Sequence, residues 1–141
     1  MAVSKMKKWR IEYFREYRPG PLSFWVHRHL DNEVWTLASK YDPALPKAIP
    51  SMGFPVLFVD APGTELRFAS IAEVEHFLEV IGQKNMPTSM QLTKRRNASY
   101  GPNGHWLSRL PSALKPWRQR EKLIPVIESG LCQLKAIYDL N

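Results

Sequence analysis

The chain has 141 residues, of which 44% are hydrophobic and 23% charged, and its formal net charge is +7. These proportions are typical of one globular domain and exclude disorder over most of the length. No apolar run approaches the roughly 20 residues that span a bilayer, and the single cysteine, Cys132, excludes an internal disulfide. We therefore expect a soluble, cytoplasmic protein without membrane contact.

The first third of the chain predicts three strands and a loop. Segment 9–17 (WRIEYFREY) interleaves aromatic and polar residues, which is typical of a strand. Segments 24–30 and 33–41 show the same pattern, and residues 31–32 are expected to form a hairpin between them. Segment 42–53 contains three prolines and is expected to be an extended loop.

The next segment predicts a strand–turn–strand unit. Residues 54–60 (FPVLFVD) are apolar on both sides, which indicates a central strand covered on each face. Residues 61–64 place proline and glycine where a type II turn needs them. Residues 65–69 then return as the partner strand.

Ser70 and Glu73 form the Ser-x-x-Glu capping box that opens a helix. Gly82 is expected to end this helix. Glu73, Glu75 and Glu79 are expected on its outer side, where they aid solubility. The apolar face consists of Ile71, Val74, Phe77, Leu78 and Ile81, which recur at helical spacing.

The C-terminal part predicts a long connection and one long helix. Segment 83–103 is expected to be a basic connection, followed by a short helix that starts at Asn103 and ends before Pro111. The last helix is expected from 115 or 116 to 140, with Pro125 either kinking it or marking a new start. The sequence as a whole predicts one α+β domain, with a mostly antiparallel sheet of four to five strands and two main helices packed on it.

The net charge is concentrated in segment 94–122. It contains eight basic residues and one acidic residue, whereas the other residues carry equal numbers of each. Such a surplus attracts phosphate or acidic surfaces if it is continuous in the folded protein. The candidate anion-binding residues are Lys94, Arg95, Arg96, Tyr100, His105, Arg109, Lys115, Trp117, Arg118, Arg120 and Lys122.

Two interpretations of this segment remain open. Trp106 and Trp117 are either core residues or platforms on which bases stack. The basic residues are either a solvated helix face or an anion site. Because one local acid cannot neutralise five cations, we expect those between 109 and 122 to lie on the surface or to meet an anion.

Residues 101–111 (Gly-Pro-Asn-Gly-His-Trp-Leu-Ser-Arg-Leu-Pro) resemble a stretch in small bacterial proteins of unassigned function. The resemblance implies no activity.

Metal, cofactor and nucleophile motifs are weak. His27 and His29 would lie on one side of a strand as paired metal ligands do, but no third ligand is evident, which favours two half-exposed histidines. Ser108 and His105 lack an acid that would orient the histidine. We therefore expect no metal and no cofactor.

Three functions follow from these observations. The leading one is a non-catalytic module whose basic surface binds nucleic acid or another polyanion. An alternative is an assembly unit, with homo-oligomers possible, that docks on an acidic protein and leaves Trp25 and Trp35 uncovered on a sheet face. Another is a small enzyme for a phosphorylated or carboxylated molecule, with His105, Arg109 and Asp60 converging; the missing catalytic motif disfavours it.

Overall fold

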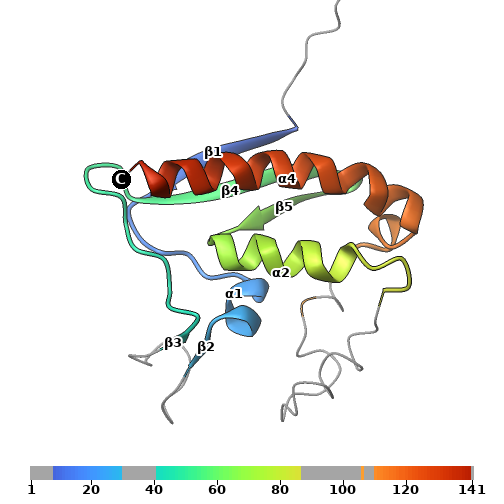
Figure 1. Cartoon of the computed structure of the whole chain (residues 1–141), viewed down its shortest axis with the longest axis horizontal. Helices are drawn as coiled ribbons and strands as arrows, with labels where there is room; N and C mark the ends of the chain where they lie inside the picture. The colour runs from blue at the N-terminus through green and yellow to red at the C-terminus, as the bar shows by residue number, and fades with distance from the viewer. Residues whose placement is uncertain (1–7, 30–40, 87–105, 107–109, 141) are drawn as a thin grey trace, which may run out of the picture.

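The computed structural model of the chain describes residues 8–29, 41–86, 106 and 110–140. Three strands form an antiparallel sheet, and two helices pack on it (Figure 1). The elements in chain order are β1 (Trp9–Phe14), α1 (Pro21–Val26), β2 (Arg28–His29), β3 (Tyr41–Asp42), β4 (Phe54–Ala61), β5 (Thr64–Phe68), α2 (Ile71–Ile81), the 3-10 turn η4 (Ser112–Leu114) and α4 (Trp117–Asp139). The predicted α+β class is confirmed.

Strand β4 is the centre of the sheet, with β1 and β5 as antiparallel neighbours. Val56 and Leu57, which face opposite sides of the sheet because they are adjacent, are 2% and 0% exposed. A two-residue turn joins β4 to β5, and its Gly63 has a φ of 78°, as a type II turn requires. The predicted strand–turn–strand–helix unit is therefore confirmed.

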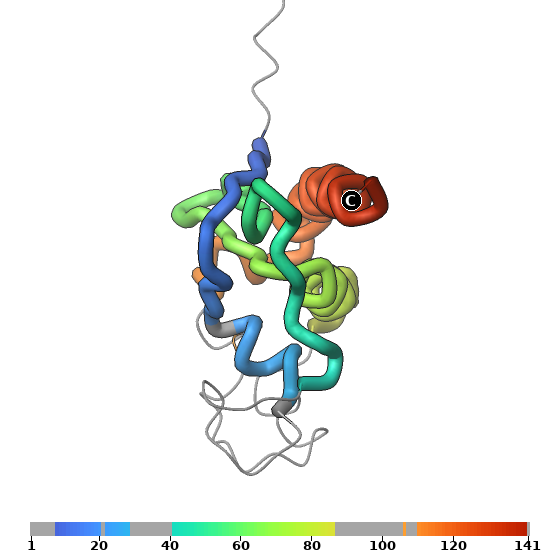
Figure 2. The backbone as a smooth tube through the Cα atoms, turned by 90° about the vertical axis from the view of Figure 1, so that its left-hand side faces the viewer, coloured from blue at the N-terminus to red at the C-terminus, as the bar shows by residue number. Residues whose placement is uncertain are grey.

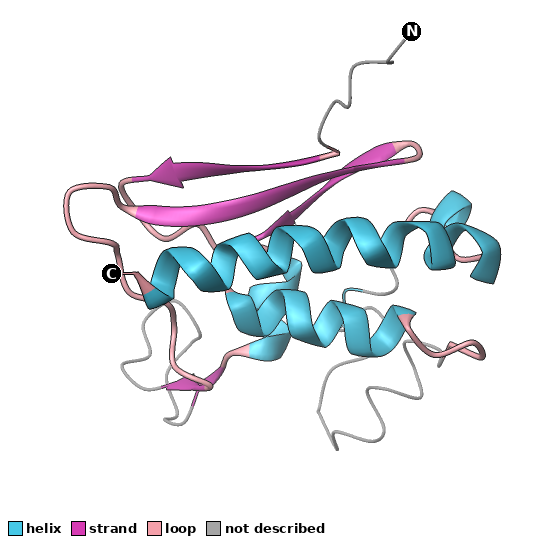
Figure 3. Cartoon of the chain, turned by 45° about the horizontal axis from the view of Figure 1, so that its top comes forward, coloured by secondary structure: helices cyan, strands magenta, loops and turns pink. Residues whose placement is uncertain are grey.

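Helices α2 and α4 cover the same face of the sheet (Figures 2 and 3). On α4, a Cβ at Gly130 would come within 2.7 Å of the Leu57 Cδ1 atom, so the absence of a side chain lets the helix approach β4 closely. On α2, the Phe77 ring packs edge-on against Phe68 with ring centroids 5.1 Å apart. Trp106 is 5% exposed and packs on Phe77, with ring centroids 4.9 Å apart, so it is a core residue rather than a stacking platform.

The predicted count of four to five strands is not confirmed. The main sheet has three strands among the described residues, and β2 and β3 form a separate ladder of two residue pairs. The strand expected at 33–41 lies outside the described residues apart from its last residue, Tyr41. The hairpin expected at 31–32 lies outside them as well.

The strand predicted at 24–30 is wrong over residues 24–26, which belong to helix α1; Arg28 and His29 form the short strand β2. Pro21 occupies the first helical position, where its missing N–H breaks no hydrogen bond. The Ser23 Oγ atom accepts the Gly20 N–H at 3.0 Å, which closes the first turn. Local capping thus outweighs the strand propensity of the aromatic residues.

Helix α4 confirms the prediction of a long C-terminal helix, and it continues through Pro125 without ending. Its buried stripe includes Leu123, Ile127, Leu131 and Leu134. No helix in the described part of the chain is both long and apolar enough to cross a membrane.

None of the described helices lies on the opposite face of the sheet (Figure 3), and arginine side chains stack on aromatic rings there. The Arg10 guanidinium lies 4.5 Å from the centroid of the Phe58 ring, and Arg18 lies at the same distance from Phe14. Arg10 also forms an ion pair with Glu65 on β5. These contacts partly cover rings that would otherwise be open to solvent.

The expectation that Trp25 is uncovered on a sheet face is wrong. Trp25 belongs to α1 and is 8% exposed. Trp35, its expected companion, lies outside the described residues.

Candidate functional site

Glu73 is the centre of a buried hydrogen-bond network between α1 and α2, and its side chain is 1% exposed. Its Oε2 atom accepts hydrogen bonds from Tyr17 at 3.3 Å, Ser23 at 3.0 Å and Ser70 at 3.0 Å. Its Oε1 atom accepts the Ala69 N–H at 3.2 Å. Burial raises the pKa of Tyr17, and the Glu73 carboxylate raises it further, so this hydroxyl keeps the hydrogen that it donates.

The prediction that Glu73 lies on the outer side of α2 is wrong, although Glu75 and Glu79 are exposed as expected. The capping box itself is confirmed, because the Ser70 Oγ atom accepts the Glu73 N–H at 3.2 Å. The carboxylate binds the Ala69 N–H in return. This contact directs the side chain back over the start of the helix, into the interior.

His27 joins the network from the end of α1 and is 1% exposed. Its Nε2 atom lies 2.8 Å from the Ser70 Oγ atom and 3.7 Å from the Glu73 Oε2 atom. Its Nδ1 atom lies 2.8 Å from the Pro43 carbonyl oxygen. A carbonyl only accepts, so Nδ1 carries a hydrogen. The interpretation of His27 as half-exposed is therefore wrong; the side chain of His29 lies outside the described part.

All hydrogen-bonding positions of the Ser70 hydroxyl are occupied. It accepts the Glu73 N–H, and it also contacts both His27 Nε2 and Glu73 Oε2. Its single hydrogen can serve only one of these two contacts, so the other needs a second proton, on the imidazole or on the carboxyl group. A serine–histidine contact can indicate a nucleophile, but this hydroxyl is committed to holding α1 against α2.

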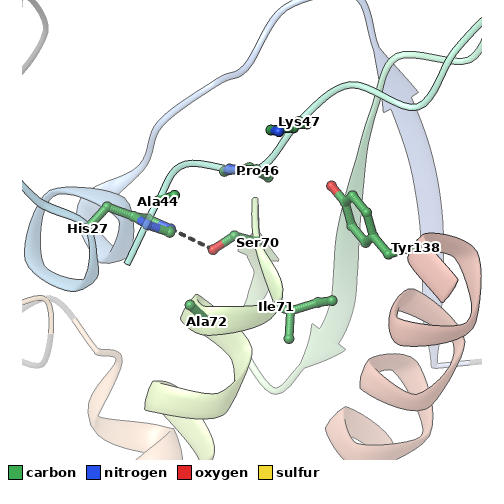
Figure 4. Close-up of a pocket in the computed structure, with 8 residues that line it drawn as sticks. All are labelled: His27, Ala44, Pro46, Lys47, Ser70, Ile71, Ala72 and Tyr138. Atoms are coloured by element: carbon green, nitrogen blue, oxygen red, sulfur yellow. Dashed lines mark hydrogen bonds between the residues drawn. The ribbon is translucent and has the colours of Figure 1, made fainter. Parts of the chain in front are cut away.

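A pocket of about 300 Å³ lies beside this network (Figure 4). His27 and Ser70 form its polar end. The first turn of α2, segment 44–47 and the last turn of α4 form its walls. These walls are mostly apolar and include Ala44, Pro46, Ile71 and Ala72.

Tyr138 lines the pocket from the last turn of α4. Its hydroxyl is buried and forms no hydrogen bond with any described residue. In Figure 4 the oxygen points toward the segment that carries Pro46 and Lys47. Burial raises the pKa of Tyr138, and Tyr13 raises it further, so the hydroxyl is protonated at neutral pH.

Lys47 is also one of the residues that line this pocket. Its side chain is exposed and forms no ion pair with any residue that the structure describes. Among the described lining residues there is no carboxylate. The positive charge therefore has no local counter-charge in the described part of the pocket.

Comparison of the chain with protein families, curated proteins and solved structures found no match. Within the described ranges, no group of three or more histidine, cysteine, aspartate or glutamate side chains could hold a metal ion. The positions and chemistry of the side chains are therefore the basis on which a function can be proposed.

Most of the predicted anion-binding residues cannot be placed. Six lie outside the described residues: Lys94, Arg95, Arg96, Tyr100, His105 and Arg109. The exposed ones that are described are Lys115, Arg118 and Lys122. The continuity of the basic segment stays a prediction. So does convergence of His105 and Arg109 on Asp60, which is exposed on β4.

Arg120 does not lie on the surface, contrary to the prediction. It is 4% exposed. Its guanidinium donates to the carbonyl oxygens of Ile81 at 2.9 Å, Lys84 at 3.0 Å and Lys115 at 2.8 Å, and also to Gln83. Three of these four carbonyls, those of Ile81, Gln83 and Lys84, lie at or just after the end of α2, where helical hydrogen bonding stops. Arg120 therefore caps α2, and its charge is satisfied inside the protein.

Trp117 is half-buried, and the Arg120 guanidinium lies 5.1 Å from the centroid of its ring. One face of the ring is therefore already in use. As a base-stacking platform, Trp117 could offer at most its other face.

The sequence contained a signal for only part of this site. The capping box paired Ser70 with Glu73, but nothing connected either residue with His27, 43 positions before Ser70. Tyr138 falls within the predicted last helix, and segment 44–47 within the predicted loop at 42–53. The pocket depends on how these segments pack against one another, and no pattern within a single segment predicts that packing.

Proposed function

We propose that this protein binds a small molecule in the pocket beside His27 and Ser70. The observation that supports this function is the cavity itself, of about 300 Å³, which has apolar walls and a few polar groups at its edges. Ligand sites in proteins combine these features, with volumes of roughly 300–1,000 Å³. The ligand is therefore compact, with a body the size of one ring or a short chain.

The pocket is held by ordered elements. The hydrogen bonds of His27 to Pro43 and Ser70 tie segment 44–47 to α1 and α2. Tyr138 lies on a helix that packs on the central strand. A pocket held in this way loses little conformational freedom when a ligand enters, which favours binding.

A fragment screen by ligand-observed NMR tests this function. We expect compact aromatic or aliphatic fragments to bind the wild-type protein, and binding to be lost in Ala72→Leu, because the larger side chain fills the cavity. Ala113→Leu adds the same atoms to an exposed residue of η4 and is expected to bind as the wild type does. Fragments that bind both variants equally, or no binding to the wild type, would contradict the proposal.

Polyanion binding by the start of α4 is a second candidate. Lys115, Arg118 and Lys122 are exposed and form no ion pair with a described residue. Arg118 and Lys122 are one helical turn apart, so they share a face on which their charges repel. A bound phosphate backbone would remove this repulsion.

Fluorescence anisotropy with short DNA and RNA over a series of salt concentrations tests this second function. We expect affinity to fall as salt rises. In the double variant Arg118→Gln, Lys122→Gln, the slope of log K against log salt should shrink by about 2. Lys135→Gln is the control, since Lys135 lies on the same helix in an ion pair with Glu75. Absence of binding at low salt, or an unchanged slope, would rule this function out.

A further inference from the structure

We propose that two copies of this chain pair through the free edge of β5, antiparallel and centred on Leu66, so that their sheets join into one continuous sheet. This inference goes beyond the small-molecule function, because the edge of β5 shares no lining residue with the pocket beside His27. It follows from the unpaired backbone of β5, from the order of charges along this strand and from a second cavity beside it.

The outer edge of β5 carries backbone groups without partners. No described strand lies beyond β5 in the main sheet (Figure 1). The Asp60 N–H donates to the Lys8 carbonyl oxygen at 2.8 Å, so this residue of β4 points its backbone groups at β1. Its antiparallel partner Glu65 therefore points its own N–H and C=O away from β4, and Arg67 does the same. Neither backbone has a hydrogen-bond partner among the described residues, and such an edge can accept another strand.

The order of charges on β5 selects a second copy as the partner. The strand reads Thr-Glu-Leu-Arg-Phe. If it is laid antiparallel against itself about Leu66, Glu65 of each copy lies opposite Arg67 of the other, and facing opposite charges stabilise a strand pair. The same register brings the outward backbone groups of these two residues face to face, as hydrogen bonding requires. A shift of the register in either direction would instead oppose two glutamates or two arginines.

Both charged residues of the edge gain from such a partner. Arg67 is exposed and forms no ion pair with a described residue. Its guanidinium donates only to the Pro19 carbonyl oxygen, at 3.3 Å, within the described part of the chain. Glu65 forms an ion pair with Arg10, but it also lies directly opposite Asp60 on β4, and facing like charges are unfavourable. A second copy brings a carboxylate to Arg67 and a further cation to Glu65.

A cavity of about 250 Å³ lies beside this edge. Four consecutive residues of β5, from Thr64 to Arg67, line it, and Leu66 among them is half-buried. In the centred register the two Leu66 residues face each other at a pair without mutual hydrogen bonds, where side chains come closest. Pairing therefore covers apolar surface as well as backbone. The other large apolar side chains that line the cavity are Leu22, Phe77, Trp106, Leu110 and Pro111.

Strand β1 forms the other edge of the sheet and is the competing surface. Its sequence Trp-Arg-Ile-Glu-Tyr has the same self-complementary order about Ile11. The charges of β1 are already paired within the chain, because Arg10 forms ion pairs with both Glu12 and Glu65. The edge of β5, where Arg67 has no carboxylate among the described residues, is therefore the one that gains more from a second copy.

Analytical ultracentrifugation of the whole chain tests the inference. We expect the wild type to form a dimer of twice 16.3 kDa, with a dissociation constant of about 10 μM, because an edge contact of five residues is smaller than a standard interface. Glu65→Arg and Arg67→Glu each set like charges against each other at two symmetric pairs and should each weaken the dimer at least about tenfold. Glu128→Arg, an exposed charge reversal on α4, is the control and should leave the dimer unchanged.

Mixing the two single variants restores opposite charges at both pairs. A mixture of Glu65→Arg with Arg67→Glu should therefore form a heterodimer as tightly as the wild type pairs, and the double variant should recover the homodimer. Circular dichroism verifies that each variant is folded. The proposal is overturned if the folded mixture and the folded double variant stay monomeric, or if neither single variant weakens the dimer. A wild type that is monomeric at about 300 μM, far above the expected dissociation constant, would also overturn it and leave this edge to a strand of another protein.

Disulfide trapping tests the register, in the background Cys132→Ser because Cys132 is exposed. Leu66→Cys places two thiols at directly facing positions, whose Cβ atoms are about 4.5–5.5 Å apart, and mild oxidation should link the dimer. Thr64→Cys faces residue 68 of the second copy and should not link. A link through Ile11→Cys instead would show that the β1 edges pair and would overturn the choice of β5, as would a dimer that Leu66→Cys does not link.

Discussion

Replacement of Glu73 by alanine is expected to lower the free energy of unfolding by about 3–5 kcal/mol, as the loss of one partner from a buried charged network does. The variant leaves the hydroxyl groups of Tyr17, Ser23 and Ser70 without their acceptor. It also leaves the Ala69 N–H without its acceptor. Chemical denaturation followed by circular dichroism measures the change.

Glu79→Ala is the matched control for this experiment, because Glu79 belongs to the same helix and is exposed. Its effect should stay within about 0.5 kcal/mol. The smaller changes Ser23→Ala and Tyr17→Phe each remove one donor and should cost about 1 kcal/mol. If Glu73→Ala were as stable as Glu79→Ala, the network would not be what holds α1 against α2.

Replacement of Arg120 by methionine is expected to lower the free energy of unfolding by about 2–4 kcal/mol, because carbonyl oxygens at a buried helix end lose a charged donor. Methionine keeps most of the length of the side chain, so the change isolates the guanidinium hydrogen bonds to Ile81, Lys84 and their neighbours. Hydrogen exchange should speed up most in the last turn of α2, which the guanidinium caps.

Arg118→Met provides the comparison on the same helix, two residues away and exposed. It is expected to change stability by less than about 0.5 kcal/mol. The same two variants also test polyanion binding by the start of α4. Arg118→Met should lower the affinity for nucleic acid, whereas Arg120→Met should not change the affinity of the folded protein. Equal stability of the two variants would mean that Arg120 is not the cap of α2.

Local patterns were reliable where one element carried its own signal. The residues from 54 to 81 combine a strand that is apolar on both faces, a Pro-Gly turn and a capping box, and each of these features is decided within a few residues. The long stripe of α4 likewise predicted a helix to within two residues at its start. Each of these segments folds as its own sequence indicates.

Local patterns failed where burial depends on a distant partner. Glu73 was expected in solvent because glutamate on an amphipathic helix usually is. Its burial is favourable because Tyr17 and Ser23, which are distant in the sequence, donate hydrogen bonds to it in addition to the local donors. Arg120 was expected in solvent for the same reason as Glu73. The end of α2 lies about 36 to 39 positions away along the chain and supplies the carbonyl oxygens that replace water around Arg120.

The order of amino acids alone determined the class of this protein, its central hairpin, its two main helices and the concentration of positive charge in one segment. Only the tertiary structure decided which polar side chains are buried, and it alone brought His27, segment 44–47, Ser70 and Tyr138 around one cavity. The physical reason is that propensity and periodicity act over one or two turns of chain. The hydrogen-bond partner of a buried polar group, by contrast, is determined by how whole helices and strands pack together.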